Sequence, residues 1–231
     1  MPGPTLHFEC LERSGAVRYR SVDPRSLLIA GWAGRDPVAV QSHIEELAAL
    51  GVPRPARVPT VYRAAASLLT RSDVIEVAGR GSSGEIEVVI LSLEDGLWVG
   101  VGSDHTDRRL ERSSVTWAKQ LCAKPVGGRL WRLDDVETHW DQLELRSHAV
   151  IEGRRRLYQE GRLSLLLPPR SLIALAGIRG ELPPGTVLFG GTLPVPGGIS
   201  FASRFEMDLA DPVLGRALTH VYDVIDLPEE G

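Results

Sequence analysis

Cysteine is scarce in this chain of 231 residues. Cys10 and Cys122 are the only two, too few and too far apart for a zinc ribbon or a disulfide scaffold, so we expect two reduced thiols. A chain of this length buries roughly 70% of its unfolded surface and needs neither device in order to fold. Any metal bound here would therefore serve a function.

Long apolar runs and an excess of basic residues are also lacking. No segment has the ~20 consecutive apolar residues of a membrane-spanning helix. Residues 1–15 carry charges where a signal peptide would be apolar, which predicts a cytoplasmic protein without a membrane partner. Because 26 basic residues face 30 acidic ones, for a net charge of −4, we expect no nucleic-acid partner.

Lysine is nearly absent. All but two of the 26 basic residues are arginine, and Lys119 and Lys124 lie close together in one segment. Only the lysine ammonium is a compact donor whose pKa can fall to a useful value on burial. A functional lysine in this segment is one interpretation, and two surface lysines in an arginine-rich sequence are the other.

The pattern of apolar and turn residues predicts an α+β chain that is rich in strand. Two apolar pieces around a turn predict a hairpin over residues 6–20. Strands dominate from residue 74 onward, and two of them, residues 143–152 and 155–167, are joined around Gly153. Short helices are expected over residues 36–51, 61–69, 134–143 and 168–177. No repeat or flexible linker divides the chain, which favours one compact unit.

The helix expected over residues 36–51 carries a candidate catalytic pair. Asp36 can cap its free amides, and Pro37 suits its first turn. His43 and Glu46 are three residues apart and therefore project from one side of the helix. The carboxylate can orient and polarise the imidazole, although on spacing alone a solvated pair on an exposed face is the simpler interpretation.

Two apolar strands around an Asp-Gly turn form the most informative pattern. A two-residue loop of Asp95 and Gly96 is a favoured hairpin connection and would place Glu87 opposite Asp104. Glu85 points to the same side, since side chains alternate along a strand. Like charges on one patch repel each other, so this patch is expected to hold a cation or to be spread into solvent.

Three carboxylates that leave room for water and substrate suit a hard divalent ion. Mg²⁺ fits first, with Mn²⁺ and Ca²⁺ as alternatives, whereas zinc would want more His or Cys nearby. His105 follows directly in the sequence, but strand alternation turns it to the opposite face, so we expect a structural role for it. The pattern leaves an acidic sheet face without a metal open as well.

Five motifs in this sequence carry a family resemblance. In chain order they are SHIEELAALGVPRP, GEIEVVIL, GSDHTDRRLE, WAKQLCAKPVGGRLW and LPPGTVLFGGTLP. They resemble the N-Y-x-x-H-x-x-E segment, the E-x-E strand, the N-D-x-[ST]-x-R-D-x-Q block, the A-K-[SG] segment with its P-x-G-P-W turn, and the L-x-P-G-D-x-I-x-T-G-T-P stretch of the fumarylacetoacetate hydrolase (FAH)-like superfamily. The resemblance extends from Gly31 to the C-terminus.

The resemblance implies an architecture. The fold would be α+β, a β-rich FAH-type mixed β-sandwich or roll with a few short helices. Residues 1–58 would be an N-terminal appendage with a hairpin and a lid-like helix, and residues 59–231 an FAH-like catalytic domain. Members of the superfamily are typically homodimers or higher oligomers, so a homodimer or a higher homo-oligomer is expected here.

The resemblance also implies roles for individual residues. Position by position, these are metal ligation by Glu85, Glu87 and Asp104, catalysis by His43, Glu46 and Lys119, and substrate binding by Arg108 and Thr192. The chain departs from the family pattern at Ser103, Arg109, Glu111 and Leu193, where substrate would be recognised. The resemblance therefore implies a divergent branch and names no substrate.

The implied activity is divalent-metal-dependent hydrolysis of a C–C bond in an acylpyruvate-like 2-oxo (1,3-diketo) acid through a metal-stabilised enolate. His43, oriented by Glu46, would take a proton from the attacking water, and Lys119 would stabilise the oxyanion. Three alternatives stay open: decarboxylation or dehydration of a 2-oxo or sugar-derived acid at the same site, a Schiff base on Lys119, and a non-catalytic binding protein on this fold.

Overall fold

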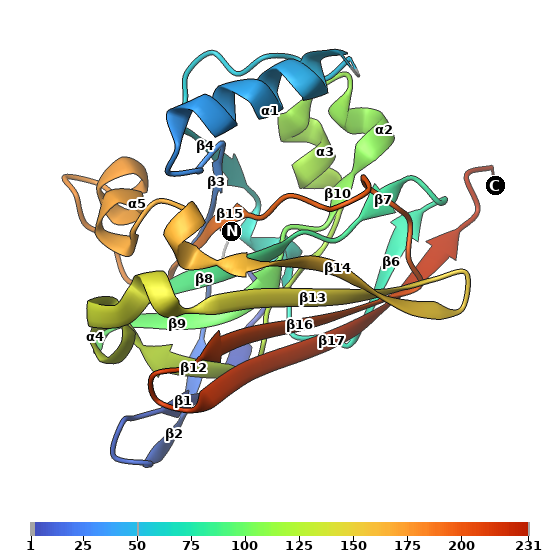
Figure 1. Ribbon diagram of the computed structural model, residues 1–231. Helices are drawn as coiled ribbons and strands as arrows, with labels where there is room; N and C mark the ends of the chain where they lie inside the picture. The colour runs from blue at the N-terminus through green and yellow to red at the C-terminus, as the bar shows by residue number, and fades with distance from the viewer. Residues whose placement is uncertain (1–2, 50, 231) are drawn as a thin grey trace.

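Strands make up most of the regular structure in this computed structural model, which describes residues 3–49 and 51–230 (Figure 1). The strands are β1 (Leu6–Leu11), β2 (Val17–Val22), β3 (Ser26–Gly31), β4 (Thr60–Ala64), β5 (Leu69–Thr70), β6 (Val74–Ala78), β7 (Ser82–Ser83), β8 (Ile86–Leu93), β9 (Gly96–Ser103), β10 (Thr106–Asp107), β11 (Lys124–Pro125), β12 (Arg129–Arg132), β13 (Glu144–Ile151), β14 (Arg154–Arg162), β15 (Thr186–Thr192), β16 (Arg204–Asp211) and β17 (Arg216–Leu227).

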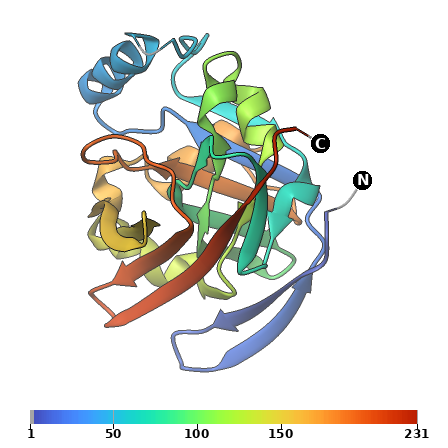
Figure 2. The same ribbon diagram turned by 90° about the vertical axis from the view of Figure 1, so that its right-hand side faces the viewer.

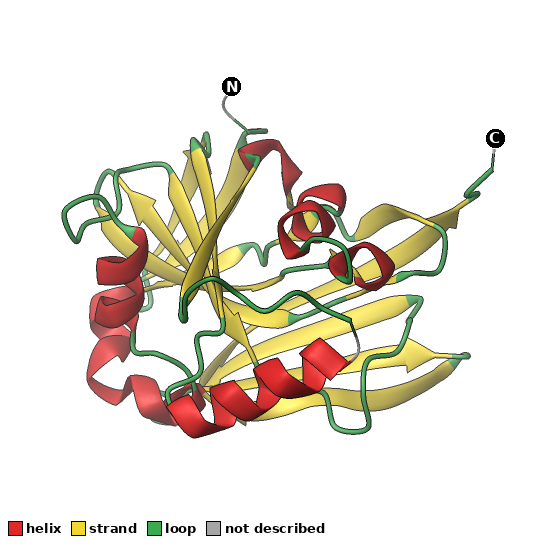
Figure 3. Ribbon diagram, turned by 90° about the horizontal axis from the view of Figure 1, so that it is seen from above, coloured by secondary structure: helices red, strands yellow, loops and turns green. Residues whose placement is uncertain are grey.

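The helices are short and lie around the strands rather than between the sheets (Figure 3). They are α1 (Pro37–Ala49), α2 (Arg108–Glu111), α3 (Val115–Leu121), α4 (Leu133–Val136) and α5 (Pro169–Ala176), with 3-10 turns η1 (Ala66–Leu68), η2 (Glu137–Gln142) and η3 (Leu163–Leu165). Among the described residues, no helix is long and apolar enough to cross a membrane.

Two mixed sheets form the body of the molecule. The larger sheet has eight strands in the order β2-β1-β12-β9-β8-β15-β3-β4, and the second has five in the order β14-β13-β16-β17-β6. Two short ladders, β10-β7 and β11-β5, complete the strand pairing of the described residues. This is the β-rich α+β architecture that the sequence predicts.

Strand β8 lies at the centre of both hydrophobic cores, and all eight of its residues are buried. Val88 and Ile90 belong to the core shared by the two sheets, whereas Val89 and Leu91 belong to a second core on the other face of the large sheet. This division follows from side-chain alternation along a strand. A strand with two apolar faces is a rigid support for the polar residues at its end.

The β8–β9 hairpin differs from the expected register. Leu93 pairs with Gly96, so the two-residue loop is Glu94 and Asp95, and Gly96 begins β9 with a φ of +123°. Glu87 therefore pairs with Gly102 instead of Asp104. A shift by an even number of residues keeps every side chain on its face, so the carboxylates still share one side.

The N-terminal hairpin is present as expected, formed by β1 and β2 at the edge of the large sheet (Figure 2). Strand β1 continues the sheet by parallel pairing with β12, and β3 lies between β15 and β4. Residues 6–31 thus contribute strands to the large sheet, and a separate unit over residues 1–58 stays a prediction.

The helix predicted over residues 36–51 is confirmed as α1. Asp36 caps it by accepting a hydrogen bond from the Val38 N–H at 2.9 Å, and Gly51 follows with a φ of +92°. Ile44 is the only described residue of α1 that is buried, so the helix rests on the body through a narrow contact. The sequence predicts an apolar stripe of Val40, Ile44, Leu47 and Leu50 on this helix, and Leu50 lies outside the described residues.

The helix predicted over residues 61–69 is wrong. Thr60–Ala64 is strand β4, which pairs antiparallel with β3 at the sheet edge, and only the short turn η1 is helical. Thr, Val and Tyr favour an extended backbone, and the open edge of β3 gives that backbone its hydrogen-bond partners. The expected helices at residues 134–143 and 168–177 are confirmed as α4 with η2, and as α5.

Candidate functional site

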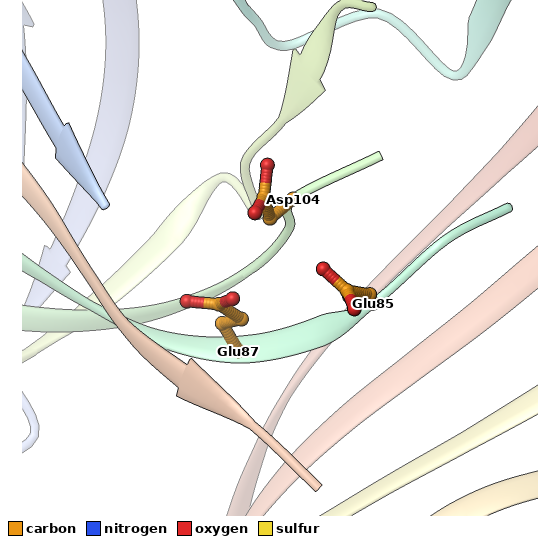
Figure 4. Close-up of side chains that lie close together, drawn as sticks. All are labelled: Glu85, Glu87 and Asp104. Atoms are coloured by element: carbon orange, nitrogen blue, oxygen red, sulfur yellow. The ribbon is translucent and has the colours of Figure 1, made fainter. Parts of the chain in front are cut away.

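Three carboxylates meet where strands β8 and β9 come together (Figure 4). Glu85 directly precedes β8, Glu87 is the second residue of that strand, and Asp104 directly follows β9. The Asp104 N–H donates to the Glu85 carbonyl at 3.0 Å, which places these two residues opposite each other. One oxygen from each side chain lies within 4.8 Å of the other two, so the expected cluster is present.

Glu87 is held deep in the protein with only 2% of its surface exposed. Its Oε2 accepts a hydrogen bond of 2.8 Å from the Gly191 N–H on β15. Burial, and then the charge of Asp104, raises the pKa of Glu87 well above its ordinary value, although Lys119 acts in the opposite direction. Glu87 is therefore the carboxyl of this cluster that holds a proton most readily.

Both lysines of the chain turn inward to Asp104, which is fully buried. Lys119 on α3 forms an ion pair with Asp104 Oδ2, and its Nζ lies 3.5 Å from Glu85 Oε2. The Lys124 Nζ lies 3.0 Å from Asp104 Oδ1. Burial alone would raise the pKa of Asp104, but the two ammonium groups outweigh it and lower the pKa to about 2. These are functional or structural lysines, and the surface interpretation is wrong.

Lys119 keeps its positive charge at neutral pH. Burial would lower its pKa, but Asp104, Glu85 and Glu87 together raise the pKa above the ordinary lysine value. An amine that stays protonated is a poor nucleophile, which counts against a Schiff base at this position.

Arg108 binds two carboxylates, Glu85 and Glu111, and so holds the cluster in place. Its guanidinium lies 3.0 Å from Glu85 Oε1 and donates to Glu111 Oε2 at 3.0 Å, while its Nε donates to Ser83 at 2.7 Å. The predicted role of Arg108 in substrate binding stays a prediction, because the contacts of the described residues engage it with protein groups. The sequence marks Glu111 only as a departure from the family pattern, and its pairing with Arg108 was not predicted, since the four-residue helix α2 that carries it is too short for a periodic pattern.

The charges of the cluster leave room for a cation. Lys119, Lys124 and Arg108 face four carboxyl groups, and the surplus one corresponds to Glu87 with its raised pKa. Asp104 Oδ1 is buried and accepts no hydrogen bond of regular geometry from the described residues, although the Lys124 Nζ lies 3.0 Å away. A divalent ion would replace the proton on Glu87 and bind one oxygen from each of the three carboxylates, so the donor set fits a hard metal ion.

A cavity of about 510 Å³ opens beside the cluster. It lies against α1, α3, η3 and the end of β15, and α1 lies over this side of the molecule in Figure 1. Five of the predicted site residues line it: His43, Glu85, Glu87, Lys119 and Thr192. The volume is in the range of small-molecule sites, so the cavity can hold a ligand that touches the carboxylates.

His43 and Glu46 form the expected pair on α1. The His43 Nδ1 lies 3.6 Å from Glu46 Oε2, and the two side chains are 52% and 69% exposed. The His43 ring also lies 5.8 Å from the Trp32 ring, measured between centroids. The imidazole therefore faces the cavity on one side and its carboxylate partner on the other.

Thr192 has internal partners in addition to its place in the cavity wall. Its hydroxyl donates to the Ile86 carbonyl at 2.8 Å and accepts from Gln159 Nε2 at 2.8 Å. Because its proton is already used, the side chain can only accept a further hydrogen bond. Substrate binding by Thr192 stays a prediction.

His105 has the structural role that strand alternation predicts. Its ring is fully buried between the Tyr222 hydroxyl, 3.0 Å from Nδ1, and the Ser82 hydroxyl, 2.8 Å from Nε2. Burial lowers the pKa of His105 to about 3, so the ring is neutral. The same Tyr222 hydroxyl bonds to Ser103, which accepts from the Glu85 N–H at 3.2 Å. This network fixes the backbone beneath the carboxylates.

Most of the chain matches a known protein family. Residues 30–222 match the family described as protein of unknown function DUF2848. The chain belongs to this family. No curated protein matches this DUF2848 sequence.

Solved structures share the fold of this DUF2848 protein. The crystal structure of Cg1458 with inhibitor has a TM-score of 0.60 and 17% identity over 91% of this chain and 81% of its own. A hexagonal crystal form of 2-keto-3-deoxyarabinonate dehydratase has a TM-score of 0.61 and 15% identity over 92% of this chain and 77% of its own. 2-keto-3-deoxy-D-arabinonate dehydratase complexed with magnesium and 2,5-dioxopentanoate has a TM-score of 0.59 and 15% identity over 91% and 77%. At these identities the likeness concerns the fold, and the predicted FAH-type fold class is confirmed.

Proposed function

We propose that this DUF2848 protein is an enzyme of the FAH-like superfamily that acts on a small 2-oxo acid with a bound divalent metal ion. The cavity that joins His43 to Glu85, Glu87 and Lys119 is the observation that carries this proposal. The five motifs from Gly31 onward and the shared fold support it further. The reaction that the site supports best is hydrolysis of a C–C bond in an acylpyruvate-like 1,3-diketo acid.

Glu85, Glu87 and Asp104 would hold the ion, with Mg²⁺ first and Mn²⁺ or Ca²⁺ as alternatives. When bound, the ion would polarise the 2-oxo and carboxylate oxygens of the substrate. Arg108 and Lys119 hold Glu85 in place from both sides, and Gly191 holds Glu87. A structure similar to this chain contains magnesium, which supports the choice of ion.

His43 would act as the general base. Because Nδ1 faces Glu46, Nε2 is the nitrogen free to take a proton from a water that attacks the distal carbonyl. The Lys119 ammonium, charged and in the cavity wall, would stabilise the negative charge on the attacked oxygen. Helix α1, attached through Ile44, would close over the cavity and exclude water.

Dehydration is the second candidate reaction. It is favoured by one observation, the likeness of the fold to 2-keto-3-deoxyarabinonate dehydratase. It would use the same carboxylates and the same cavity, with a hydroxyl group leaving from the substrate instead of a C–C bond breaking. A decarboxylase would share these features too, so substrates decide between the reactions.

The test is an activity screen of purified protein with Mg²⁺ against acylpyruvates, oxaloacetate and 2-keto-3-deoxyarabinonate. We expect loss of the diketo absorbance of an acylpyruvate, abolished by a chelator. His43→Ala is expected to lower kcat by about 10²- to 10⁴-fold while metal binding is kept. Metal binding with no turnover of any of these acids would instead favour a binding protein.

The quaternary structure is part of the same proposal. A homodimer or a higher homo-oligomer is expected from the family resemblance. Sedimentation equilibrium of the purified chain measures it, and a monomer at micromolar concentration would contradict it.

A further inference from the structure

The side chains around the cavity differ in character according to the element that carries them. The charged groups of the wall are Glu85 and Glu87, Glu111 on α2, Lys119 on α3, and Arg35 and Asp36 before α1. The remaining wall is largely apolar. It contains Ala39, Val40 and Leu47 of α1, Val115 at the start of α3, and Leu193 and Pro194 after β15. None of these six side chains can donate or accept a hydrogen bond.

Several polar side chains in the same wall are already paired within the protein. Arg35 forms two hydrogen bonds of 2.7 Å with Asp141 and donates its Nε to the Leu166 carbonyl at 3.0 Å. The hydroxyl of Thr192 donates to Ile86 and accepts from Gln159. Arg35 keeps two of its five N–H donors and Thr192 keeps one acceptor site, so most of their hydrogen-bonding capacity is used within the protein.

The aromatic part of the wall is similarly engaged. The Trp32 indole N–H donates to the Tyr62 hydroxyl at 3.3 Å, so the two rings present mainly their apolar surfaces. Trp32 has a φ of +58°, a backbone conformation that a bulky residue adopts only when its surroundings hold it there. Tyr62 also lies under the Lys119 ammonium, 5.8 Å from Nζ to the ring centroid. The two rings are joined by this hydrogen bond and lie in the cavity wall, with His43 beside Trp32 and Lys119 beside Tyr62.

We propose that the substrate carries an apolar alkyl or aryl group at the end away from its 2-oxo acid head, and that this group binds against the apolar wall. The inference rests on the proposed function, because the head is placed at the carboxylates. It deepens that function by selecting a substrate class. A polyhydroxylated acid would give up water around several hydroxyl groups and find few partners in return.

The size of the cavity is consistent with this class. A volume of about 510 Å³ exceeds what a three-carbon acid such as pyruvate fills. Each methylene group moved from water into an apolar wall strengthens binding. Affinity for 2-oxo acids should therefore increase with the length of an alkyl chain and not with the number of hydroxyl groups.

The experiment is calorimetric titration of the Mg²⁺-saturated protein with four probes: oxalate, pyruvate, 2-oxohexanoate and 2-keto-3-deoxyarabinonate. Oxalate and pyruvate report on the head site alone. We expect 2-oxohexanoate, which has three more methylene groups than pyruvate, to bind at least about tenfold more tightly than pyruvate. We expect 2-keto-3-deoxyarabinonate to bind no more tightly than pyruvate.

Two variants of α1 locate the effect. Leu47→Asn places an amide in the apolar wall and should remove most of the advantage of 2-oxohexanoate while leaving oxalate and pyruvate binding unchanged. Val38→Asn is the matched control on the same helix, because Val38 is 75% exposed and points away from the cavity wall. It should change the affinity for none of the four probes.

The outcomes separate this inference from the proposed function. Oxalate and pyruvate binding without any advantage of 2-oxohexanoate, or tighter binding of 2-keto-3-deoxyarabinonate, would overturn the apolar substrate and leave the metal site in place. An advantage of 2-oxohexanoate that Leu47→Asn does not reduce would overturn the assigned wall. Absence of binding by every probe would overturn the head site, and with it both proposals.

Discussion

Lys119 on α3 and Asp104 after β9 form a buried ion pair, and Glu87 lies beside it with only 2% of its surface exposed. The pair fixes the charge state of two groups, because each raises the population of the other's charged form. Among the described residues, Glu87 forms no ion pair of this kind and accepts one hydrogen bond, from the Gly191 N–H, although the charge of Lys119 also acts on it. In the absence of a metal, protonation of Glu87 is therefore the way in which this cluster relieves its surplus negative charge.

Glu87→Gln is expected to make the metal-free protein more stable at neutral pH. A raised pKa means that the folded state binds the Glu87 proton more tightly than the unfolded state does. The corresponding stability is fully present below pH 4.5 and is lost as the pH rises through the raised pKa, whereas glutamine has no proton to lose. Urea unfolding in a chelator at several pH values measures this difference.

Glu94→Gln is the matched control for that experiment, because Glu94 is exposed in the turn of the same hairpin. The stability of the Glu94→Gln variant should change with pH in the same way as that of the unmodified protein. If Glu87→Gln also follows the unmodified protein at every pH, the surplus charge does not reside on Glu87.

Asp104→Asn is expected to destabilise the protein by about 3–5 kcal/mol at neutral pH, because two buried ammonium groups lose their counter-charge. The pKa of about 2 lies below the ordinary 3.8, so this stability is present above pH 3.8 and is lost as the pH falls through about 2. Denaturant unfolding at pH 7 measures the loss.

An exposed ion pair provides the comparison for Asp104. Glu160 pairs with Arg146 at 2.5 Å on the surface, with side chains that are nearly half exposed, so Glu160→Gln should cost less than about 1 kcal/mol. Equal losses for Asp104→Asn and Glu160→Gln would show that the two lysines do not depend on Asp104.

The carboxylate cluster could be predicted from the sequence because it depends only on which face of the sheet each side chain lies on. That face is unchanged when the strand register shifts by an even number of residues. The expected turn at Asp95 and Gly96 was displaced by one residue, which moved the partner of Glu87 from Asp104 to Gly102. A displacement of the register by two preserves the face of each side chain. The prediction of three carboxylates on one side therefore survived an error in the turn itself.

The surroundings of the cluster could not be predicted in the same way. Glu111 lies on a helix of four residues, too short for any periodic pattern, and Trp32 and Tyr62 meet only because β3 and β4 pair. The contact of Lys124 with Asp104 joins two residues that are distant in the sequence, one at the start of β11 and one after β9. Such contacts depend on tertiary packing, which local propensities do not encode.

Ile44→Ser is expected to loosen α1 selectively. Ile44 is the only buried residue among those described in α1, so its replacement removes the main apolar contact between the helix and the body. Hydrogen exchange of the amides of residues 40–49 should accelerate, while exchange in β8 and β9 stays slow. Val38→Ser on the same helix, at a position that is 75% exposed, should change neither. If the amides of α1 in Ile44→Ser exchange more slowly than those of β8 and β9, the proposed role of α1 as a lid is contradicted.

The proposed function depends on Glu85, Glu87 and Asp104 binding a divalent ion that a 2-oxo acid can reach. Titration of Mn²⁺ into metal-free protein, with and without oxalate, tests it most directly beside a Glu85→Gln/Glu87→Gln variant. We expect one ion per chain in the unmodified protein, tighter binding in the presence of oxalate, and loss of both in the variant. Binding that the variant retains, or that oxalate leaves unchanged, would contradict the proposal.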